Sequence, residues 1–158
     1  MKFGRLVVCA AIAFAAMTQL ALAQSKDLVD TALATQKFNL FLSLARDADL
    51  TFDLKNPGPY TIFAPTDAAF NAKYTKSQLD ALRGNPRRLR DILLHHVLRG
   101  RVDAVTAIKM KTLHPMAGAP IMTSVVDGRG VVGGAHFVIT NVNTSNGVLH
   151  GIDTVLVP

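Results

Sequence analysis

The stretch Tyr60–Phe70, YTIFAPTDAAF, constrains the fold of this 158-residue chain more than any other. Its first five residues are β-branched, aromatic or small and carry no charge, which favours a strand buried on at least one face. Pro65 cannot donate a ladder hydrogen bond, so the strand should end there. Thr66 can cap a following helix, and Asp67 suits the positive end of that helix. We therefore predict a strand-to-helix corner, with a scaffold role, at which Phe70 folds back onto the strand.

The first 23 residues have the pattern of a secretory signal peptide. Lys2 and Arg5 supply a positive start, the stretch that follows is almost wholly apolar, and Ala21-Leu22-Ala23 matches a cleavage motif. The apolar run is short for a membrane anchor. Cys9 is the only cysteine and lies inside this run, so the mature chain, residues 24–158, is predicted to have no disulfide or thiol chemistry. The sequence therefore predicts export to the periplasm, the extracellular space or the cell surface.

The mature chain is mildly basic. Without Lys2 and Arg5, 15 basic residues remain against 11 acidic ones, all of them aspartate, which leaves a net charge of +4. Basic residues are nowhere interleaved with stacking aromatic residues, which argues against nucleic-acid binding. Outside the predicted signal peptide no uninterrupted apolar run reaches the length of a membrane span, so we predict no span in the mature chain.

Apolar periodicity and turn signals divide the mature chain into a helical part and a later part rich in strands. Helices are expected at about 28–33, 38–45, 76–83, 86–93 and 102–109, with a short turn of helix within 47–56. Thr75 and Gln78 have the form of a capping box for the helix at 76–83, and Asn85 is placed to cap the helix at 86–93. Strands are expected at 60–64, 95–100, 111–116, 120–126, 135–142, 147–152 and 154–157. Because helices and strands segregate along the chain, we predict one α+β domain over residues 24–158.

Two segments of the chain resemble the signature boxes of the fasciclin domain family. Thr61–Phe70 is similar to the first box and Asn146–Pro158 to the second. The residues that carry the resemblance are Phe63, Pro65, Thr66, Asp67, Phe70, Asn146, Gly147, His150 and Asp153. The resemblance covers residues 26–158 and implies an α+β, fasciclin-like fold in which a helical layer packs beside a wedge of two β-sheets.

The same resemblance implies a function. Fasciclin domains are extracellular or cell-surface modules for adhesion and protein interaction, without known catalysis as a class, and some bacterial and algal relatives are associated with apolar pigments. Two positions depart from the family pattern. His95 stands where a tyrosine precedes the histidine of a family pair, here His96, which weakens any inference of an integrin-type contact. Gly151 stands where an apolar residue is commoner, which predicts a looser strand beside His150.

The histidines do not form a recognisable metal motif. On a strand, His95 and His96 would point to opposite faces, and His96 would then share a core with His150. The simplest interpretation is a buried neutral imidazole held by backbone groups, while an exposed histidine as an axial haem ligand remains the alternative. HxH, HExxH, GxSxG and Gly-rich phosphate motifs are all absent from the sequence. We therefore predict no catalytic residue, no metal site and no cofactor.

Six arginines lie close together in the sequence, at Arg83, Arg87, Arg88, Arg90, Arg99 and Arg101. Arg87 and Arg88 are at helical spacing from Asp91, so they could form a solvated, salt-bridged face. Guanidinium groups also bind carboxylates and phosphates, which would suit an anionic polysaccharide, lipid headgroups or an acidic protein.

From these residues we predict an interaction or adhesion module that binds a protein or a cell-surface glycan. Its recognition surface is expected near His95, His96, Arg87, Arg88, Arg99 and Arg101. The alternative function is a carrier for an apolar small molecule, such as a carotenoid or a tetrapyrrole, held in a groove between the helical and sheet layers.

Overall fold

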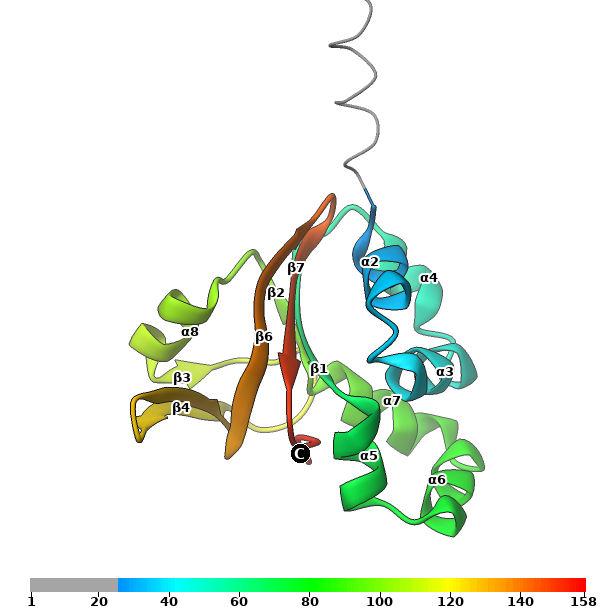
Figure 1. Cartoon of the computed structure of the whole chain (residues 1–158). Helices are drawn as coiled ribbons and strands as arrows, with labels where there is room; N and C mark the ends of the chain where they lie inside the picture. The colour runs from blue at the N-terminus through cyan, green and yellow to red at the C-terminus, as the bar shows by residue number, and fades with distance from the viewer. Residues whose placement is uncertain (1–25) are drawn as a thin grey trace, which may run out of the picture.

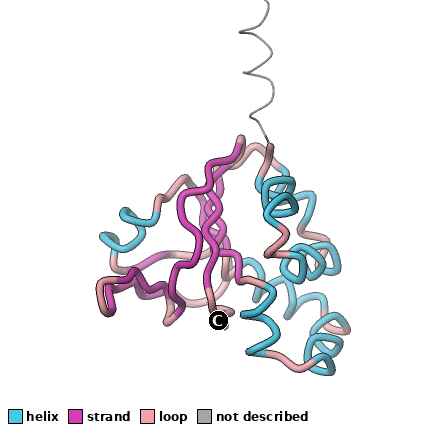
Figure 2. Tube along the Cα trace, viewed as in Figure 1, coloured by secondary structure: helices cyan, strands magenta, loops and turns pink. Residues whose placement is uncertain are grey.

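The structure is a computed structural model that describes residues 26–158, and the predicted signal peptide lies outside these residues. Most helices gather on one side of a mixed sheet and α8 lies on the other side (Figures 1 and 2). The helices are α2 (Leu28–Thr35), α3 (Asn39–Asp47), α4 (Thr51–Lys55), α5 (Asp67–Lys73), α6 (Lys76–Arg83), α7 (Pro86–Leu94) and α8 (Ala104–Met110). The strands are β1 (Tyr60–Pro65), β2 (Val97–Arg99), β3 (Thr112–Leu113), β4 (Ile121–Val126), β5 (Arg129–Val132), β6 (Ala135–Thr144) and β7 (Gly147–Ile152).

The strands form one hydrogen-bonded series in the order β2-β1-β7-β6-β5-β4-β3. β1 runs parallel to β7 over its whole length, so the two segments that resemble signature boxes are direct neighbours. β6 shifts register twice along β7, and the part of the sheet that holds β3 and β4 diverges from β1 and β7 (Figure 1). The α+β class is therefore confirmed, and the two arms of the predicted wedge are joined through β6 into one series of seven strands.

Side-chain caps explain where five of the seven described helices begin, and α3 and α4 have no such cap. The N-cap residues Asp27, Thr66, Thr75, Asn85 and Asp103 each accept a hydrogen bond from the backbone N–H three residues later. The predicted capping box of α6 is present, because the side chain of Gln78 also accepts from the N-cap backbone. The helix boundaries are thus encoded locally.

The centre of the sheet is buried on both faces. Ile62, Phe70 and Leu149 belong to the core on the side of α2–α7, which also holds Phe38 and Phe41. A second core on the side of α8 contains Phe63, Leu98, Ala107, Leu113, Ile121, Val132, Ala135, Ile152 and Leu156. Neighbouring residues of β1 and of β7 thus alternate between the two cores, as side chains of a strand must.

The predicted strands differ from the structure chiefly in two segments, and one further strand was not predicted. The strand expected at 95–100 begins only at Val97, because the N–H groups of His95 and His96 bond back into α7 and close the helix. Residues 154–157 form no strand, since the paired part of β7 ends where β1 ends, opposite Pro65. β5 was not predicted, because Gly130 in its middle weakens the strand pattern.

Candidate interaction surface

The first signature box is held by internal contacts. Thr66 caps α5, as predicted, with its hydroxyl oxygen 3.2 Å from the Ala69 nitrogen. The carboxylate of Asp67 reaches across to α3, where it accepts from the Leu40 N–H at 2.7 Å and from the Asn39 amide at 3.0 Å. The corner therefore begins α5 and is also hydrogen-bonded to α3 through Asp67.

Asn146 fastens the second box to the helical layer. Its side-chain oxygen accepts from the Leu28 N–H at 2.9 Å, and its amide nitrogen donates to the carbonyls of Leu54 at 2.8 Å and Asn56 at 2.9 Å. The side chain is buried. One residue in the β6–β7 turn thus satisfies backbone groups from α2, from α4 and from the chain after α4.

Close backbone approaches explain two glycines of β7. A Cβ at Gly147 would collide with the carbonyl of Tyr60 on β1. At Gly151 a Cβ would lie 3.0 Å from the ring of Phe38, so the departure from the family pattern makes room for a core side chain packed on the strand. Beyond the strand, the Asp153 carboxylate accepts from a backbone N–H of β6 at 2.8 Å.

His150 is a buried imidazole with both ring nitrogens in use. Nδ1 lies 3.1 Å from the Asn141 nitrogen and accepts its N–H, so Nε2 carries the proton and donates to the Val102 carbonyl at 2.8 Å. The ring stacks on Phe63 with centroids 5.4 Å apart. Burial lowers its pKa, against the opposing effects of the Val102 carbonyl and the Asp103 carboxylate. The ring is therefore a neutral structural group.

His96 is fully buried, and both of its ring nitrogens also form hydrogen bonds. Nδ1 donates to the Ile92 carbonyl at 2.7 Å, and Nε2 accepts from the Leu156 N–H at 2.9 Å. Burial lowers the pKa of His96 to about 4, with a smaller lowering from His95 and an opposing effect of the Ile92 carbonyl. His95 is 5% exposed, and its Nδ1 donates to the Ala117 carbonyl at 3.0 Å.

The two buried histidines do not pack against each other. His96 contacts Phe41 edge-on in the helical-side core, whereas His150 contacts Phe63 and Phe137 on the side of α8. The prediction that they share a core is wrong, because His96 lies in the turn after α7 and not on a strand. With its ring enclosed, His96 has no atom to offer to a surface partner.

Three of the six arginines bond to oxygen acceptors of the protein, and a fourth lines a pocket beside one of these pairs. Arg83 pairs with Asp47 at 2.9 Å, and Arg90 pairs with Asp53 at 2.7 Å. Arg101 donates to the carbonyls of Gly147 at 3.0 Å and Thr144 at 3.1 Å. Arg99, on the edge strand β2, is exposed and lines a pocket with Arg90 and Asp53.

Arg87 and Arg88 differ from Arg83, Arg90 and Arg101, whose guanidinium groups bond to oxygen atoms of the protein. Both are exposed on α7, and within residues 26–158 neither forms an ion pair within 4.0 Å. The predicted pairs with Asp91 are therefore not formed. The structure leaves these two guanidinium groups available to an external anion.

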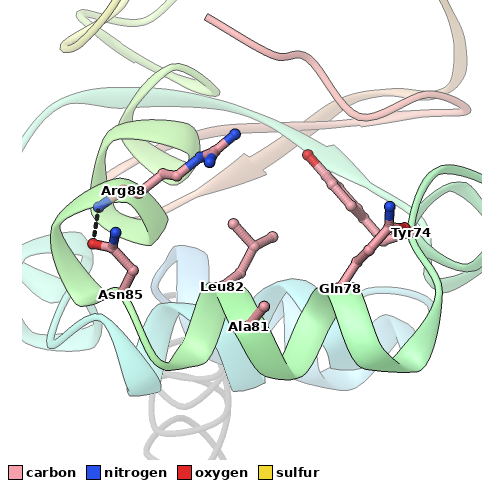
Figure 3. Close-up of a pocket in the computed structure, with 6 residues that line it drawn as sticks. All are labelled: Tyr74, Gln78, Ala81, Leu82, Asn85 and Arg88. Carbon is pink, nitrogen blue, oxygen red and sulfur yellow. Dashed lines mark hydrogen bonds between the residues drawn. The ribbon is translucent and has the colours of Figure 1, made fainter.

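A pocket of about 290 Å³ lies beside Arg88, between α6, α7 and the end of α5 (Figure 3). Its lining residues are Tyr74, Gln78, Ala81, Leu82, Asn85 and Arg88. In Figure 3 the Leu82 side chain rises from α6 between Tyr74 and Arg88, which flank it on either side. Burial raises the pKa of the Tyr74 phenol, and the positive charge of Arg88 opposes this shift. The phenol and the guanidinium therefore interact electrostatically across the pocket.

The unused polar groups of this pocket are N–H and O–H donors. Gln78 Oε1 accepts from the Thr75 N–H at 2.9 Å, and Asn85 Oδ1 accepts from the Arg88 N–H at 3.2 Å. Helix capping therefore consumes both amide oxygens and leaves both amide NH₂ groups. None of the six lining residues carries a carboxylate. From the sequence, Gln78 and Asn85 were predicted only as capping residues, because the fold and not their spacing brings them to one pocket.

Two further hollows bear on the predictions. A groove of about 260 Å³ lies between the helical layer and β1–β2, lined by Leu54, Tyr60, Leu94, Met116 and charged side chains. Another of about 620 Å³ beside α8 is lined mainly by polar residues, including Arg101, Asp103 and Lys109.

Over residues 26–158, no group of three His, Cys, Asp or Glu side chains is placed to hold a metal ion. Across the same residues, no helix combines the length and the apolar character that crossing a membrane requires.

Comparison with known proteins places these features in a family. A model of the fasciclin domain matches residues 36–158. The uncharacterized protein sll1735 of Synechocystis is 32% identical over 130 residues, which are 82% of this chain and 96% of that protein. The immunogenic protein MPB70 of Mycobacterium bovis is 36% identical over 106 residues, covering 67% of this chain and 53% of the relative. The cell surface glycolipoprotein MPB83 of the same species is 35% identical over 113 residues, covering 67% and 47%.

The fold is also similar to a solved structure. A FAS1 domain pair from the insect cell adhesion molecule Fasciclin I superposes with a TM-score of 0.76 over 85% of this chain and 52% of that chain. The sequence identity is 16%, so this likeness concerns the fold. It confirms the predicted fasciclin-like arrangement of helices and strands.

Proposed function

Since the chain belongs to the fasciclin domain family, we propose that it is a non-enzymatic interaction and adhesion module for a protein or glycan at a cell surface. The family is associated with adhesion and with cell-surface proteins, and one relative is itself a cell surface glycolipoprotein. Export through the predicted signal peptide, to the periplasm or beyond it, forms part of this proposal. The partner chemistry that we favour is an anionic polysaccharide.

The observation that carries the proposal is the state of Arg87 and Arg88. They are neighbours on an exposed face of α7, and no carboxylate of the described chain neutralises them. A guanidinium group presents a planar set of donors that fits a carboxylate or phosphate bidentately. By contrast, Arg83 and Arg90 are already paired with Asp47 and Asp53. We therefore centre the proposed surface on the α7 face, because His95 and His96 are buried and Arg101 bonds to backbone carbonyls. Arg99 is exposed but lies beside the Arg90–Asp53 pair.

A binding assay on an immobilised acidic polysaccharide tests the proposal. We expect the purified chain to be retained on alginate at low salt and released as the ionic strength rises, because salt screens exposed charges. The double variant Arg87→Ala plus Arg88→Ala should lose retention. The matched control is Lys109→Ala plus Lys111→Ala, which removes the same charge from the far side of the molecule. Equal loss in both double variants, or no retention of the wild type, would contradict the proposal.

The carrier function remains a second candidate because a groove does lie between the helical layer and the sheet. Tyr60, Leu94 and Met116 give it apolar surface, but Asp53, Arg90 and Arg99 also line it. Its volume of about 260 Å³ is below the range of roughly 300–1,000 Å³ that small-molecule sites occupy. An absorbance scan and an organic extract of the purified protein test it, and a colourless protein with an empty extract would remove this candidate.

A further inference from the structure

We propose that the pocket between α6 and α7 binds a sugar carboxylate, namely one uronate unit of an acidic polysaccharide. This inference rests on the proposed function, and it assigns a defined subsite next to the exposed arginines. The site consists of Tyr74, Gln78, Leu82, Asn85 and Arg88.

The donor set selects an anion rich in oxygen acceptors. Arg88 brings a full positive charge that no carboxylate of residues 26–158 pairs within 4.0 Å. Gln78 and Asn85 contribute amide NH₂ groups, because their oxygens are held at 2.9 Å and 3.2 Å by backbone N–H groups. A ligand carboxylate would receive charge-assisted hydrogen bonds from the guanidinium, and hydroxyl or ring oxygens would accept from the two amides.

The apolar part of the pocket selects a ring. Leu82 and Ala81 form its floor, and the ring of Tyr74 forms one side (Figure 3). An aromatic face packs against the C–H face of a pyranose while the Tyr74 hydroxyl remains able to bond a sugar oxygen. The opposite side is Arg88, so a bound sugar would have its ring near Tyr74 and its carboxylate near the guanidinium.

The size of the pocket limits the ligand to one such unit. Its volume of about 290 Å³ is near the lower limit of small-molecule sites, roughly 300 Å³. The pocket is also open to the surface, so neighbouring units of a polymer can extend beyond it over the exposed part of α7 that carries Arg87. An acidic peptide fits less well, because an aspartate or glutamate side chain would engage Arg88 but would leave both amides and the Tyr74 face without partners.

Titration of the full chain with sodium glucuronate tests the inference. We expect the backbone amide resonances of residues 74–88 to shift and saturate in an NMR titration. Glucose, which has the same ring and lacks the carboxylate, should bind about tenfold more weakly or not at all, because the charge-assisted bonds are missing. Equal binding of the two sugars, or shifts confined to other parts of the chain, would overturn the proposal.

Two conservative variants separate binding from folding. Gln78→Glu keeps the capping-box acceptor, since glutamate serves that position equally well, but it replaces the NH₂ donor with a carboxylate oxygen. Asn85→Asp does the same at the cap of α7. Each should weaken glucuronate binding about tenfold while leaving the urea midpoint unchanged. The matched control is Lys109→Ala on α8, which lowers the net charge by the same single unit outside the lining and should change the affinity less than twofold.

The outcomes distinguish this inference from the proposed function. If the wild type is retained on alginate but free glucuronate does not bind, the uronate pocket is wrong and the adhesion surface stands. If the protein is not retained on alginate at all, the favoured partner chemistry fails as well. A short peptide with one aspartate that binds more tightly than glucuronate would also overturn the proposal, because it would identify an acidic protein as the ligand.

Discussion

The region around β1 and β7 and the region around α6 and α7 use their polar side chains in opposite ways. Around β1 and β7, Asp67, Asn146 and His150 lie at the meeting points of distant segments, and their acceptors and donors bond to backbone groups. Around α6 and α7, capping uses only the amide oxygens of Gln78 and Asn85. The three side chains of the first region are therefore engaged in internal hydrogen bonds, whereas the amide NH₂ groups of the second region remain as donors.

This contrast explains why a signature motif and a binding site need not coincide. A buried polar group that lacks a partner costs free energy, so residues such as Asn146 are selected for internal satisfaction. Exposed groups on α7 carry no such penalty because water satisfies them, and they remain available for binding. The residues by which the family is recognised are thus the framework, and the ligand contacts are expected elsewhere.

Replacing the framework asparagine should have the largest effect. Asn146→Ala leaves the Leu28 N–H and the carbonyls of Leu54 and Asn56 without their partner, so we expect a loss of about 4 kcal/mol in the free energy of unfolding. Urea denaturation followed by circular dichroism measures it. Asn143→Ala, at an exposed position of β6, is the control and should cost less than about 0.5 kcal/mol. Similar losses of stability in the two variants would contradict the assignment of Asn146 to the framework.

The pH dependence of stability tests the buried histidines. His96 has a pKa of about 4 in the folded protein and an ordinary value of 6.5 when unfolded, so the unfolded chain binds the additional proton between these values. Its contribution is complete above pH 6.5 and is lost as the pH falls toward 4, by about 3 kcal/mol in all. The lowered pKa of His150 acts in the same direction.

Urea unfolding at pH 7.5, 5.5 and 4.5 provides the measurement. The variant His96→Gln removes the titrating group, so its stability should fall less steeply over this range, whatever its stability at pH 7.5. If the wild type and His96→Gln lose stability with the same slope, the assignment of the effect to His96 is wrong.

The arginines should give the smallest effects and the sharpest contrast. Arg101→Ala removes two hydrogen bonds to carbonyls of the β6–β7 hairpin, so a loss of about 1 kcal/mol is expected. Arg88→Ala removes no ion pair within the described chain, and its free energy of unfolding should change by less than about 0.5 kcal/mol. The order should reverse on alginate, where Arg88→Ala weakens retention more than Arg101→Ala. A larger stability loss in Arg88→Ala would show that this side chain belongs to the framework.

Much of the fold could be predicted from local signals. Thr66, Thr75 and Asn85 are caps whose roles depend on residues three positions away, and all three act as expected. The strand at Tyr60–Pro65 was predictable as well, because the residue types of the segment itself favour a strand. The errors concern segments whose state depends on distant partners, such as 154–157, which had the composition of a strand but finds no neighbour to pair with.

The candidate site was less predictable. The arginine concentration was visible in the sequence, but whether an arginine is paired depends on aspartates far away, as for Arg90 and Asp53. The sequence allowed His96 to be either a buried neutral imidazole or part of the surface, and the fold encloses its ring and bonds it to Leu156, sixty positions later in the chain.

The sequence by itself determined the class of fold, the family and the helix boundaries, because these follow from composition, motifs and hydrogen bonds between near neighbours. Only the tertiary structure decided which polar side chains bond within the protein and which remain available to a binding partner. That distinction depends on contacts between Asn146 and α2, between Asp67 and α3, and between α6 and α7, and such contacts exist only once the chain has packed.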